Sequence, residues 1–534
     1  MKARDVNDIL REDGVDALRR ALDTAVPVYT TDDAAAERRA AKPASPKPRA
    51  PKDQPGPERR TQAQALLAIA LAGDVTLYRS PDGTTYADVT VAGHRETWPT
   101  RSRGFRRWLQ RRYYEETGGA ANGDAMATAM GVIEAKAQFG GRVHEVFLRV
   151  AAHGEAIYID LCDDTWRAVE IDAEGWRLIA TPPVRFRRSP TMGPLPTPAL
   201  GGRITELRRH LNVSDRDFVL AVGWLVTALR GRGPYPILLL SGEQGTGKST
   251  AAMLLRKLID PNVAPLRGPP RDLRDLAIAA FNAHVLAFDN LSGISAELAD
   301  ALCRLSTGGG FSTRALYSDD EERVFDGQRP IICTSINDIG TRSDLSDRSI
   351  VALLQAIEAI GRKTDRDVHA AFDAAAPTIL GALFDAVAEG LRMERTVKLN
   401  RLPRMADHAV WVRACEGALW PEKIGQHLDI YDANRGEAAE IVLDADVVAC
   451  AVRQHMDGRS EIAETSTGLL AALAAITPEH VRRGREWPPN ARALAGRLRR
   501  LAPALRRIGL LMVFEREADT GRRIVRITKD TPQK

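Results

Sequence analysis

Residues 236–250 read PILLLSGEQGTGKST, in which an apolar run is followed by a glycine-rich segment. The first part, residues 236–241, is a short continuous apolar run, which is typical of a strand buried on both faces of a parallel sheet. The second part, residues 242–250, satisfies the pattern GxxxxGK[ST] and leads into residues 251–259, whose apolar spacing predicts a helix. Strand, glycine-rich loop and helix thus follow in the order that a phosphate-binding loop requires.

Each residue type in this loop has a chemical reason. Glycines allow backbone N–H groups to wrap phosphate oxygens, and the dipole of the following helix favours negative charge. Lys248 is expected to reach the β and γ phosphates, and the Ser249 hydroxyl to ligate Mg²⁺. We therefore predict ATP and Mg²⁺ as cofactors and ATP hydrolysis as the activity. The predicted nucleotide-binding residues are Gly242, Glu243, Gln244, Gly245, Thr246, Gly247, Lys248, Ser249 and Thr250.

Two further apolar runs end in polar residues. Residues 284–289 read HVLAFD and predict a strand that ends at Asp289, whose carboxylate can hold the Mg²⁺ shell or polarise an attacking water. Residues 330–335 predict a third strand, where the hydroxyl of Thr334 can touch the γ-phosphate. Asn337 competes with Thr334 for this catalytic role. The alternative for Asp289 is a surface aspartate that follows a core strand.

Arg348 follows these strands in the segment RSDLSDRS, residues 342–349. An arginine at this point can act as an arginine finger that stabilises the γ-phosphate bound to a neighbouring subunit. The alternative is a structural surface pair between Asp347 and Arg348. Both interpretations remain open from the sequence.

Composition is that of an ordinary globular protein: 44% of the 534 residues are hydrophobic and 27% are charged. A net charge of +5 permits a nucleic-acid partner without requiring one. The five cysteines include no CxxC pair, so neither a zinc ribbon nor a disulfide framework is indicated. We see no uninterrupted apolar run of membrane-spanning length and no signal peptide, and therefore expect a cytoplasmic protein without a membrane partner.

Changes in composition divide the chain into five regions. Residues 1–60 include AAKPASPKPRAPKDQPGPERR, which predicts a disordered linker that either tethers or contacts nucleic acid. Residues 61–200 predict an α+β accessory domain, residues 201–365 the ATPase, residues 366–455 a helical region and residues 456–534 a further small domain.

The accessory domain contains two ambiguous features. Residues 102–114 read SRGFRRWLQRRYY and predict a helix whose basic and aromatic residues either contact nucleic acid or divide into a core face and a solvated face. Asp160, Asp163 and Asp164 suggest a metal site, but no second cluster of ligands at a matching spacing supports it.

Residues 302–317 read LCRLSTGGGFSTRALY, and with the three strand motifs they resemble superfamily 3 helicases of phages, plasmids and small DNA viruses, a branch of the AAA+ ATPases. The closest likeness is to the helicase half of phage and plasmid primase-helicases. The resemblance implies an α/β fold with a P-loop AAA+ parallel-sheet core and a homo-oligomeric, hexameric ring. It also implies a hairpin that grips single-stranded DNA in a central channel, with Arg314 as the first candidate for DNA contact or hairpin support and Arg323 as the second. The alternative is that Arg314 and Tyr317 brace the core. Two departures are the pair Asp289-Asn290, where the family has adjacent acids, and Thr334-Ser335 in place of a terminal asparagine.

The C-terminal region resembles a winged helix-turn-helix. Helices are predicted over residues 467–475 and 490–508, followed by two strands over residues 511–517 and 522–529 with a turn between them. Leucines at helical spacing form one face of the second helix and arginines the other. The arginines favour duplex DNA binding, although such domains also dock proteins. The predicted contacts are Arg499, Arg500 and Arg506.

Two functions follow from these features. The first is an ATP-dependent DNA helicase or replication initiator of a phage or mobile element. The second is a nucleotide-switched DNA-binding regulator or helicase loader that does not unwind DNA. The sequence does not decide between them.

Overall fold

The computed structural model describes most of the chain from Arg60 onward. The described ranges are 60–291, 294–309, 311–314, 322–325, 327–335, 343–358, 362–517 and 521–529. In 311–314, 322–325 and 343–344 only the backbone is described. The predicted linker and Asn337 lie outside the described residues.

A four-stranded sheet and three helices form the first part of the described chain. The strand order is β3-β2-β1-β4, antiparallel except for the short parallel pair of β1 with β4. Leu66, Phe105 and Ile133 are fully buried between the sheet and the helices. The elements are β1 (Val75–Arg79), β2 (Thr85–Val91), β3 (His94–Pro99), β4 (Arg142–Val143), α4 (Gln62–Ala70), α5 (Arg103–Thr117) and α6 (Gly123–Gly140).

Helix α5 is the predicted basic and aromatic helix. Phe105 and Leu109 are fully buried, and the ring of Trp108 stacks on that of Phe105 with centroids 5.6 Å apart. Arg106 and Arg107 are exposed. Phe105 therefore belongs to the core and the half-buried Trp108 packs against it, as expected for a helix that divides into a core face and a solvated face. Contact of the exposed arginines with nucleic acid remains a prediction.

A second, antiparallel sheet follows, with the strand order β6-β7-β8-β9, and a separate pair joins β5 to β10. Leu148 and Arg149 separate β5 from β6. The guanidinium of Arg149 is fully buried there. The elements are β5 (Val146–Phe147), β6 (Val150–His153), β7 (Ala156–Asp160), β8 (Ala168–Asp172), β9 (Gly175–Ile179) and β10 (Arg185–Phe186).

The third sheet is parallel throughout and has the strand order β12-β15-β11-β16. Its strands are β11 (Ile237–Ser241), β12 (Leu286–Phe288), β15 (Ile331–Ser335) and β16 (Ser349–Leu353). The helices of this region are η1 (Ile204–His210, a 3₁₀ helix), α7 (Asp215–Ala228), α8 (Lys248–Lys257), α9 (Leu273–Asn282), α10 (Ala296–Thr307) and α11 (Ser343–Ser346).

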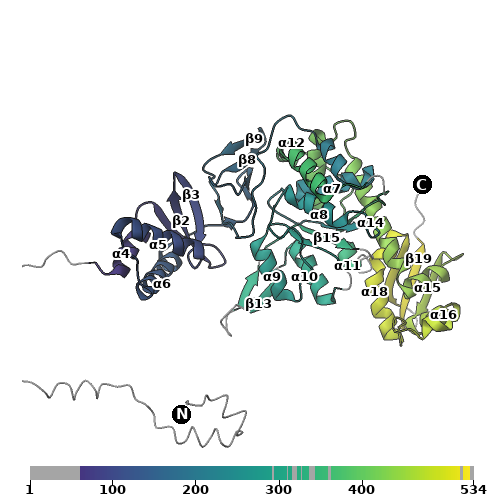
Figure 1. Cartoon of the computed structure of the whole chain (residues 1–534). Coiled ribbons are helices and arrows are strands. Elements are labelled where there is room, and N and C mark those ends of the chain that lie inside the picture. Colours follow the sequence, from purple (N-terminus) through teal and green to yellow (C-terminus); the bar gives the residue numbers. More distant parts are fainter. Residues whose placement is uncertain are drawn as a thin grey trace, which may run out of the picture. The chain divides into compact units, whose positions relative to one another are not determined.

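Both faces of this sheet are buried, as the apolar run of β11 predicts. Leu238 and Leu240 belong to a core shared with α7 and α8. Ile237 and Leu239 belong to the opposite core, shared with α9 and α10. Figure 1 shows α7 and α8 on one side of the sheet and α9 and α10 on the other. Because the strands are parallel, the residues after β11, β12 and β15 meet at one edge.

Between α10 and β15 the described backbone includes an antiparallel pair, β13 (Phe311–Arg314) with β14 (Glu322–Phe325). In its register Arg314 faces Glu322 and Thr313 faces Arg323. The predicted DNA contacts Arg314 and Arg323 therefore lie on two paired strands, and their side chains are outside the described part of the chain.

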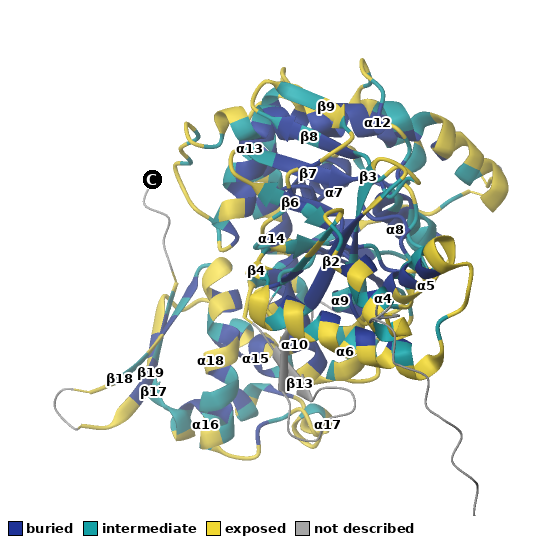
Figure 2. Ribbon diagram, turned by 90° about the vertical axis from the view of Figure 1, so that its left-hand side faces the viewer, coloured by how far each residue is buried: buried dark blue, intermediate teal, exposed yellow. Residues whose placement is uncertain are grey.

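Three long helices follow the parallel sheet: α12 (Asp365–Met393), α13 (Ala406–Leu419) and α14 (Gln426–Asp444). By length and composition α12 could cross a membrane, which a search for uninterrupted apolar runs overlooks. This is weak evidence for a membrane span, because 56% of its apolar stretch is buried inside the protein. Leu380, Leu383 and Phe384 pack in the same core as α7, and Figure 2 shows this buried side of α12.

The C-terminal part contains the predicted helices and the predicted hairpin. The prediction of two strands is incomplete, because the sheet has three in the order β17-β19-β18. Leu494, Leu498, Leu501 and Leu505 are buried, as the helical wheel predicts. The elements are α15 (Val447–His455), β17 (Glu461–Thr465), α16 (Ser466–Ile476), α17 (Glu479–Arg482), α18 (Ala491–Arg507), β18 (Leu510–Arg516) and β19 (Arg523–Lys529).

Two buried histidines make the stability of the fold sensitive to acid. Burial lowers the pKa of His284 to about 4 and that of His427 to about 3. Below the ordinary pKa of about 6.5 the unfolded chain binds protons that the folded chain does not. The contribution of these neutral histidines to the free energy of unfolding is therefore fully present above this pH. It is lost as the pH falls toward their pKa values in the folded protein.

We predict that the free energy of unfolding falls by about 1.4 kcal/mol per pH unit for each histidine below pH of about 6. Urea denaturation of His427→Gln between pH of about 4 and 7 should show a shallower pH dependence than the wild type. The variant His153→Gln, at an exposed histidine, should keep the wild-type dependence. Equal dependences in wild type and His427→Gln would contradict the prediction.

Candidate functional site

The glycine-rich loop begins where β11 ends. Gly242, Gly245 and Gly247 have φ values of 151°, 82° and 84°, in the range that favours glycine. A Cβ atom at Gly242 would lie 2.9 Å from the carbonyl oxygen of Leu354. Glycine at this position therefore meets both a conformational and a steric requirement.

Helix α8 starts directly after Gly247, and no side chain caps its N-terminus. Its first amide groups are therefore available to an anion, which the helix dipole also favours. Lys248 Nζ donates to the carbonyl oxygens of Gly242 and Glu243 at 2.8 and 2.6 Å. The ammonium group thus lies against the loop, where it can exchange these carbonyl contacts for phosphate oxygens.

Asp289 lies at the same edge of the sheet. Ser249 Oγ donates to Asp289 Oδ1 at 3.0 Å, and Thr334 Oγ1 donates to the same oxygen at 2.5 Å. The backbone N–H of Asn290 donates to Thr334 Oγ1 at 2.9 Å. Thr334 near the end of β15 and Ser249 in the first turn of α8 therefore converge on the carboxylate that follows β12. Thr334 is bonded to Asp289, so its observed contact is with the carboxylate that it orients.

The separation of Ser249 Oγ and Asp289 Oδ1 fits a Mg²⁺ site. An octahedral Mg²⁺ ion holds its ligands at about 2.0–2.1 Å, which places neighbouring ligand atoms about 3 Å apart. The observed 3.0 Å matches this spacing. Both atoms are oxygens, the ligand type that Mg²⁺ prefers.

Asp260 determines where β12 and α8 lie. Its Oδ2 accepts from the backbone N–H groups of His284 and Val285 at 2.9 and 3.0 Å, directly before β12. Its own N–H donates to Arg256 in the last turn of α8. The carboxylate therefore connects the end of the phosphate-loop helix to the start of the strand that leads to Asp289.

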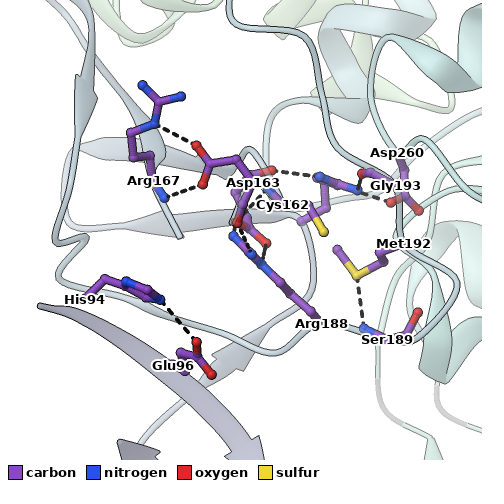
Figure 3. A network of polar contacts seen from close by, with 12 residues as sticks. His94, Glu96, Cys162, Asp163, Arg167, Arg188, Ser189, Met192, Gly193 and Asp260 are labelled. Carbon is purple, nitrogen blue, oxygen red and sulfur yellow. Dashed lines mark hydrogen bonds and ion pairs between the residues drawn. The ribbon is translucent and has the colours of Figure 1, made fainter. Parts of the chain in front are cut away.

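Arg149 neutralises this buried carboxylate from the preceding sheet. Its Nε lies 3.2 Å from Asp260 Oδ1, and both side chains are fully buried. Its other guanidinium nitrogens donate to the carbonyl oxygens of Asp160 and Gly193. Burial alone would raise the pKa of Asp260, but the charges of Arg149 and Arg256 outweigh it and lower that pKa. Figure 3 shows Asp260 beside Gly193 in this network.

The aspartates considered as metal ligands are engaged by arginines. Arg188 contacts both carboxylate oxygens of Asp160, at 2.6 and 3.0 Å. Arg167 Nε donates to Asp163 Oδ2 at 2.6 Å, and Figure 3 shows the two side chains facing each other. Asp160 and Asp163 therefore belong to a network of ion pairs with arginines, which explains their presence without a metal ion.

Arg348 lies away from the nucleotide loop of its own chain. It directly precedes β16, whose first residue Ser349 pairs with Ile237 at the start of β11. The loop follows Ser241 at the other end of β11. At about 3.3 Å per residue, the two ends of β11 are roughly 13 Å apart. Any contact between Arg348 and a γ-phosphate would therefore require a second subunit.

The predicted duplex contacts lie on α18. Arg499, Arg500 and Arg506 are exposed, on the side of the helix opposite its buried leucines. The guanidinium of Arg499 lies over the ring of Phe514, 4.7 Å from its centroid. The helix thus presents a basic face to solvent.

Sequence reasoning missed Asn212, between η1 and α7, which connects the glycine-rich loop to the segment after β16. Asn212 Nδ2 donates to the carbonyl oxygen of Gln355 at 2.5 Å and lies 3.3 Å from that of Thr246. No short motif marks Asn212, because its partner Gln355 is 143 positions away. It holds the loop close to the end of a neighbouring strand.

Comparison with known families matches two ranges of the chain. Residues 204–432 match a family described as actinomycete integrative conjugative element replication protein. Residues 448–534 match the C-terminal domain of the same RepA family. Over these ranges the chain is similar to replication proteins of mobile elements. No curated protein matches the chain.

Solved structures of the NrS-1 C-terminal region are distantly similar. One apo structure has 11% identity and a TM-score of 0.39, covering 87% of this chain and 99% of its own. A second, of residues 305–718, has 10% identity and a TM-score of 0.37, covering 87% and 98%. These TM-scores are too low to support an argument about fold or function.

We predict that Arg149→Met lowers the free energy of unfolding by about 3–5 kcal/mol, because it leaves Asp260 charged and buried without its cation. Arg149→Met combined with Asp260→Asn should recover part of this loss, since the uncompensated charge is gone. Arg395→Gln is the control, because its ion pair with Glu155 is exposed and should contribute less than about 1 kcal/mol. Urea denaturation measures all three, and a loss in Arg149→Met no larger than that in Arg395→Gln would contradict the prediction.

Proposed function

We propose that the chain is an ATP-hydrolysing protein of DNA replication, of the helicase or initiator type, which serves a mobile element. The observation that carries the proposal is the convergence of Ser249 and Thr334 on the carboxylate of Asp289. The similarity to replication proteins of mobile elements supports the biological setting. The residues around Asp289 thus support the proposed ATP hydrolysis, and the similarity to replication proteins supports the proposed role in DNA replication.

The residues divide the work of phosphoryl transfer. The uncapped first turn of α8 and Lys248 would bind the phosphates, while Ser249 and Asp289 would hold the metal ion. Bound Mg²⁺·ATP supplies the reactive phosphoanhydride. Thr334 fixes the orientation of Asp289 through its hydrogen bond, so the carboxylate needs little rearrangement when the nucleotide binds.

DNA contacts are proposed at two places. Arg314 and Arg323 on the β13–β14 pair would contact single-stranded DNA in the channel of a hexameric ring. Arg499, Arg500 and Arg506 on α18 would contact duplex phosphates. Their exposure on one helix face supports the second contact, because phosphate neutralisation requires accessible guanidinium groups.

A nucleotide-switched regulator or loader that does not unwind DNA is the second candidate. The observation that favours it is Asn290 at the position after Asp289, where an adjacent acid would provide a general base. Asn290 adopts a φ of 53°, and its N–H supports Thr334. An amide cannot accept a proton from water as a carboxylate does, so slow hydrolysis would follow.

We predict that Lys248→Ala abolishes ATP turnover, because it removes the ammonium group placed to neutralise the β and γ phosphates. Steady-state ATPase assays with single-stranded DNA measure the effect, and Lys257→Ala, in the last turn of the same helix, serves as the control. Wild-type turnover in Lys248→Ala would overturn the proposed enzymatic activity. Strand displacement on a forked DNA then separates the candidates: unwinding supports the motor, and DNA-stimulated turnover without unwinding supports the regulator.

We predict that Arg348→Ala spares ATP binding but lowers turnover about a thousandfold, as loss of an arginine finger does. Because the finger would act on a neighbour, mixtures of Arg348→Ala with Lys248→Ala should regain part of the turnover. Arg366→Ala, at an exposed arginine of α12, should retain wild-type turnover. Full activity of Arg348→Ala, or no recovery in mixed assemblies that demonstrably form, would exclude a shared site.

A further inference from the structure

An arginine-lined cavity lies apart from the nucleotide loop. Its volume is about 560 Å³, and it is formed where α14, α18, the 401–404 segment and the residue before Arg348 meet. Five arginines and two aspartates supply its charged groups. The lining residues are Asp347, Arg401, Leu402, Pro403, Arg404, Asp432, Arg435, Pro503, Arg506 and Arg507.

Asp347 is shared by three of these arginines. Its carboxylate lies 3.0 Å from Arg507, 3.4 Å from Arg404 and 3.5 Å from Arg435. Hydrogen bonds from guanidinium to carboxylate are ordinarily about 2.7–2.9 Å long. One carboxylate therefore gives Arg404 and Arg435 only long contacts.

The two aspartates do not neutralise all of the arginines that line the cavity. Arg401 contacts Asp432 at 2.8 Å, which uses the second aspartate. Arg506 lines the cavity and is exposed to solvent. The arginines that line the cavity thus outnumber its aspartates. The Nε atom of Arg435 is buried and has no hydrogen-bond partner among the described residues.

The electrostatics of Arg507 show the same excess. Burial, followed by the positive charge of Arg435, lowers the pKa of Arg507, although Asp347, Tyr431 and Asp432 act in the opposite direction. A second anion would relieve this repulsion. An oxyanion with several acceptor atoms fits best, because each guanidinium presents a planar fork of donors that matches phosphate geometry.

We propose that this cavity binds a phosphate group. Guanidinium donors from α14, α18 and the 401–404 segment surround one space, and the loosely bonded Arg404 and Arg435 would contact the phosphate oxygens. Arg506 both lines the cavity and belongs to the exposed basic face of α18, which makes a DNA backbone phosphate one source and a free or nucleotide phosphate the other. The proposal stands independently of the nucleotide site.

The experiment uses the full chain carrying Lys248→Ala, so that phosphate binding at the glycine-rich loop does not contribute. Thermal unfolding is followed with inorganic phosphate up to about 20 mM at constant ionic strength. Ligand at about ten times its Kd should raise Tm by about 2 °C. The cavity variant is Arg401→Gln with Arg404→Gln, because both side chains are substantially exposed and lie off α18.

The variants give opposite expectations. Removing both arginines should abolish the phosphate-dependent rise in Tm. Asp347→Asn should enlarge it, because a carboxylate that competes for the same guanidinium groups is removed, and a purely structural role of Asp347 would not produce this gain. Arg482→Gln, at an exposed arginine of α17, should leave the rise unchanged. An equal rise in all four proteins, or none in the parent, would overturn the proposal.

Fluorescence anisotropy with a labelled DNA duplex identifies the source of the phosphate. If a backbone phosphate occupies the cavity, the slope of log Kobs against log salt should decrease by about 0.9 for each DNA phosphate that the 401/404 variant no longer neutralises. An unchanged slope, in a variant whose Tm no longer responds to inorganic phosphate, would assign the cavity to a free or nucleotide phosphate.

Discussion

The ion pair between Arg149 and Asp260 controls the geometry of the candidate nucleotide site. Both side chains are excluded from water, where an isolated charge costs several kcal/mol and is tolerated only with a partner and further hydrogen bonds. Asp260 has both, since Arg149 supplies the charge and the amides of His284 and Val285 supply the bonds. A carboxylate with this many fixed partners constrains every segment that contacts it.

Those segments are the ones that form the site. The phosphate-loop helix α8 ends close to Asp260, and β12 starts from the amides that Asp260 accepts. Lys248 and Ser249 stand at the far end of that helix, and Asp289 stands at the far end of that strand. Helix α8 and strand β12 are therefore connected at both ends, through Asp260 at one end and through the 3.0 Å contact between Ser249 and Asp289 at the other. A displacement at the buried pair would therefore alter the distance between Ser249 and Asp289.

Local patterns predicted much of this arrangement. The apolar run before Gly242 and the periodicity after Thr250 identify a strand and a helix, and the apolar residues before Asp289 identify a second strand. The buried pair could not be predicted, because Arg149 and Asp260 are 111 positions apart and neither belongs to a recognisable motif. The same holds for the bond from Thr334 to Asp289, which gives a residue expected at the γ-phosphate a supporting role. Strand β17 was not predicted from the sequence, because its alternation of apolar and polar residues extends over only a few positions. Asn337 and the side chains of Arg314 and Arg323 remain predictions.

The position of Arg149 also bears on how the region that contains the glycine-rich loop could be prepared by itself. The matched replication-protein region begins at residue 204, so a recombinant fragment cut there would retain Asp260 and lose both Arg149 and the carbonyl group of Gly193. Such a fragment would have to bury a carboxylate without its cation, or take up a proton to fold. A fragment that starts before β5 keeps the pair intact. The matched region and the part of the chain that holds the buried ion pair therefore differ in extent, because the segment that precedes residue 204 supplies the countercharge of Asp260.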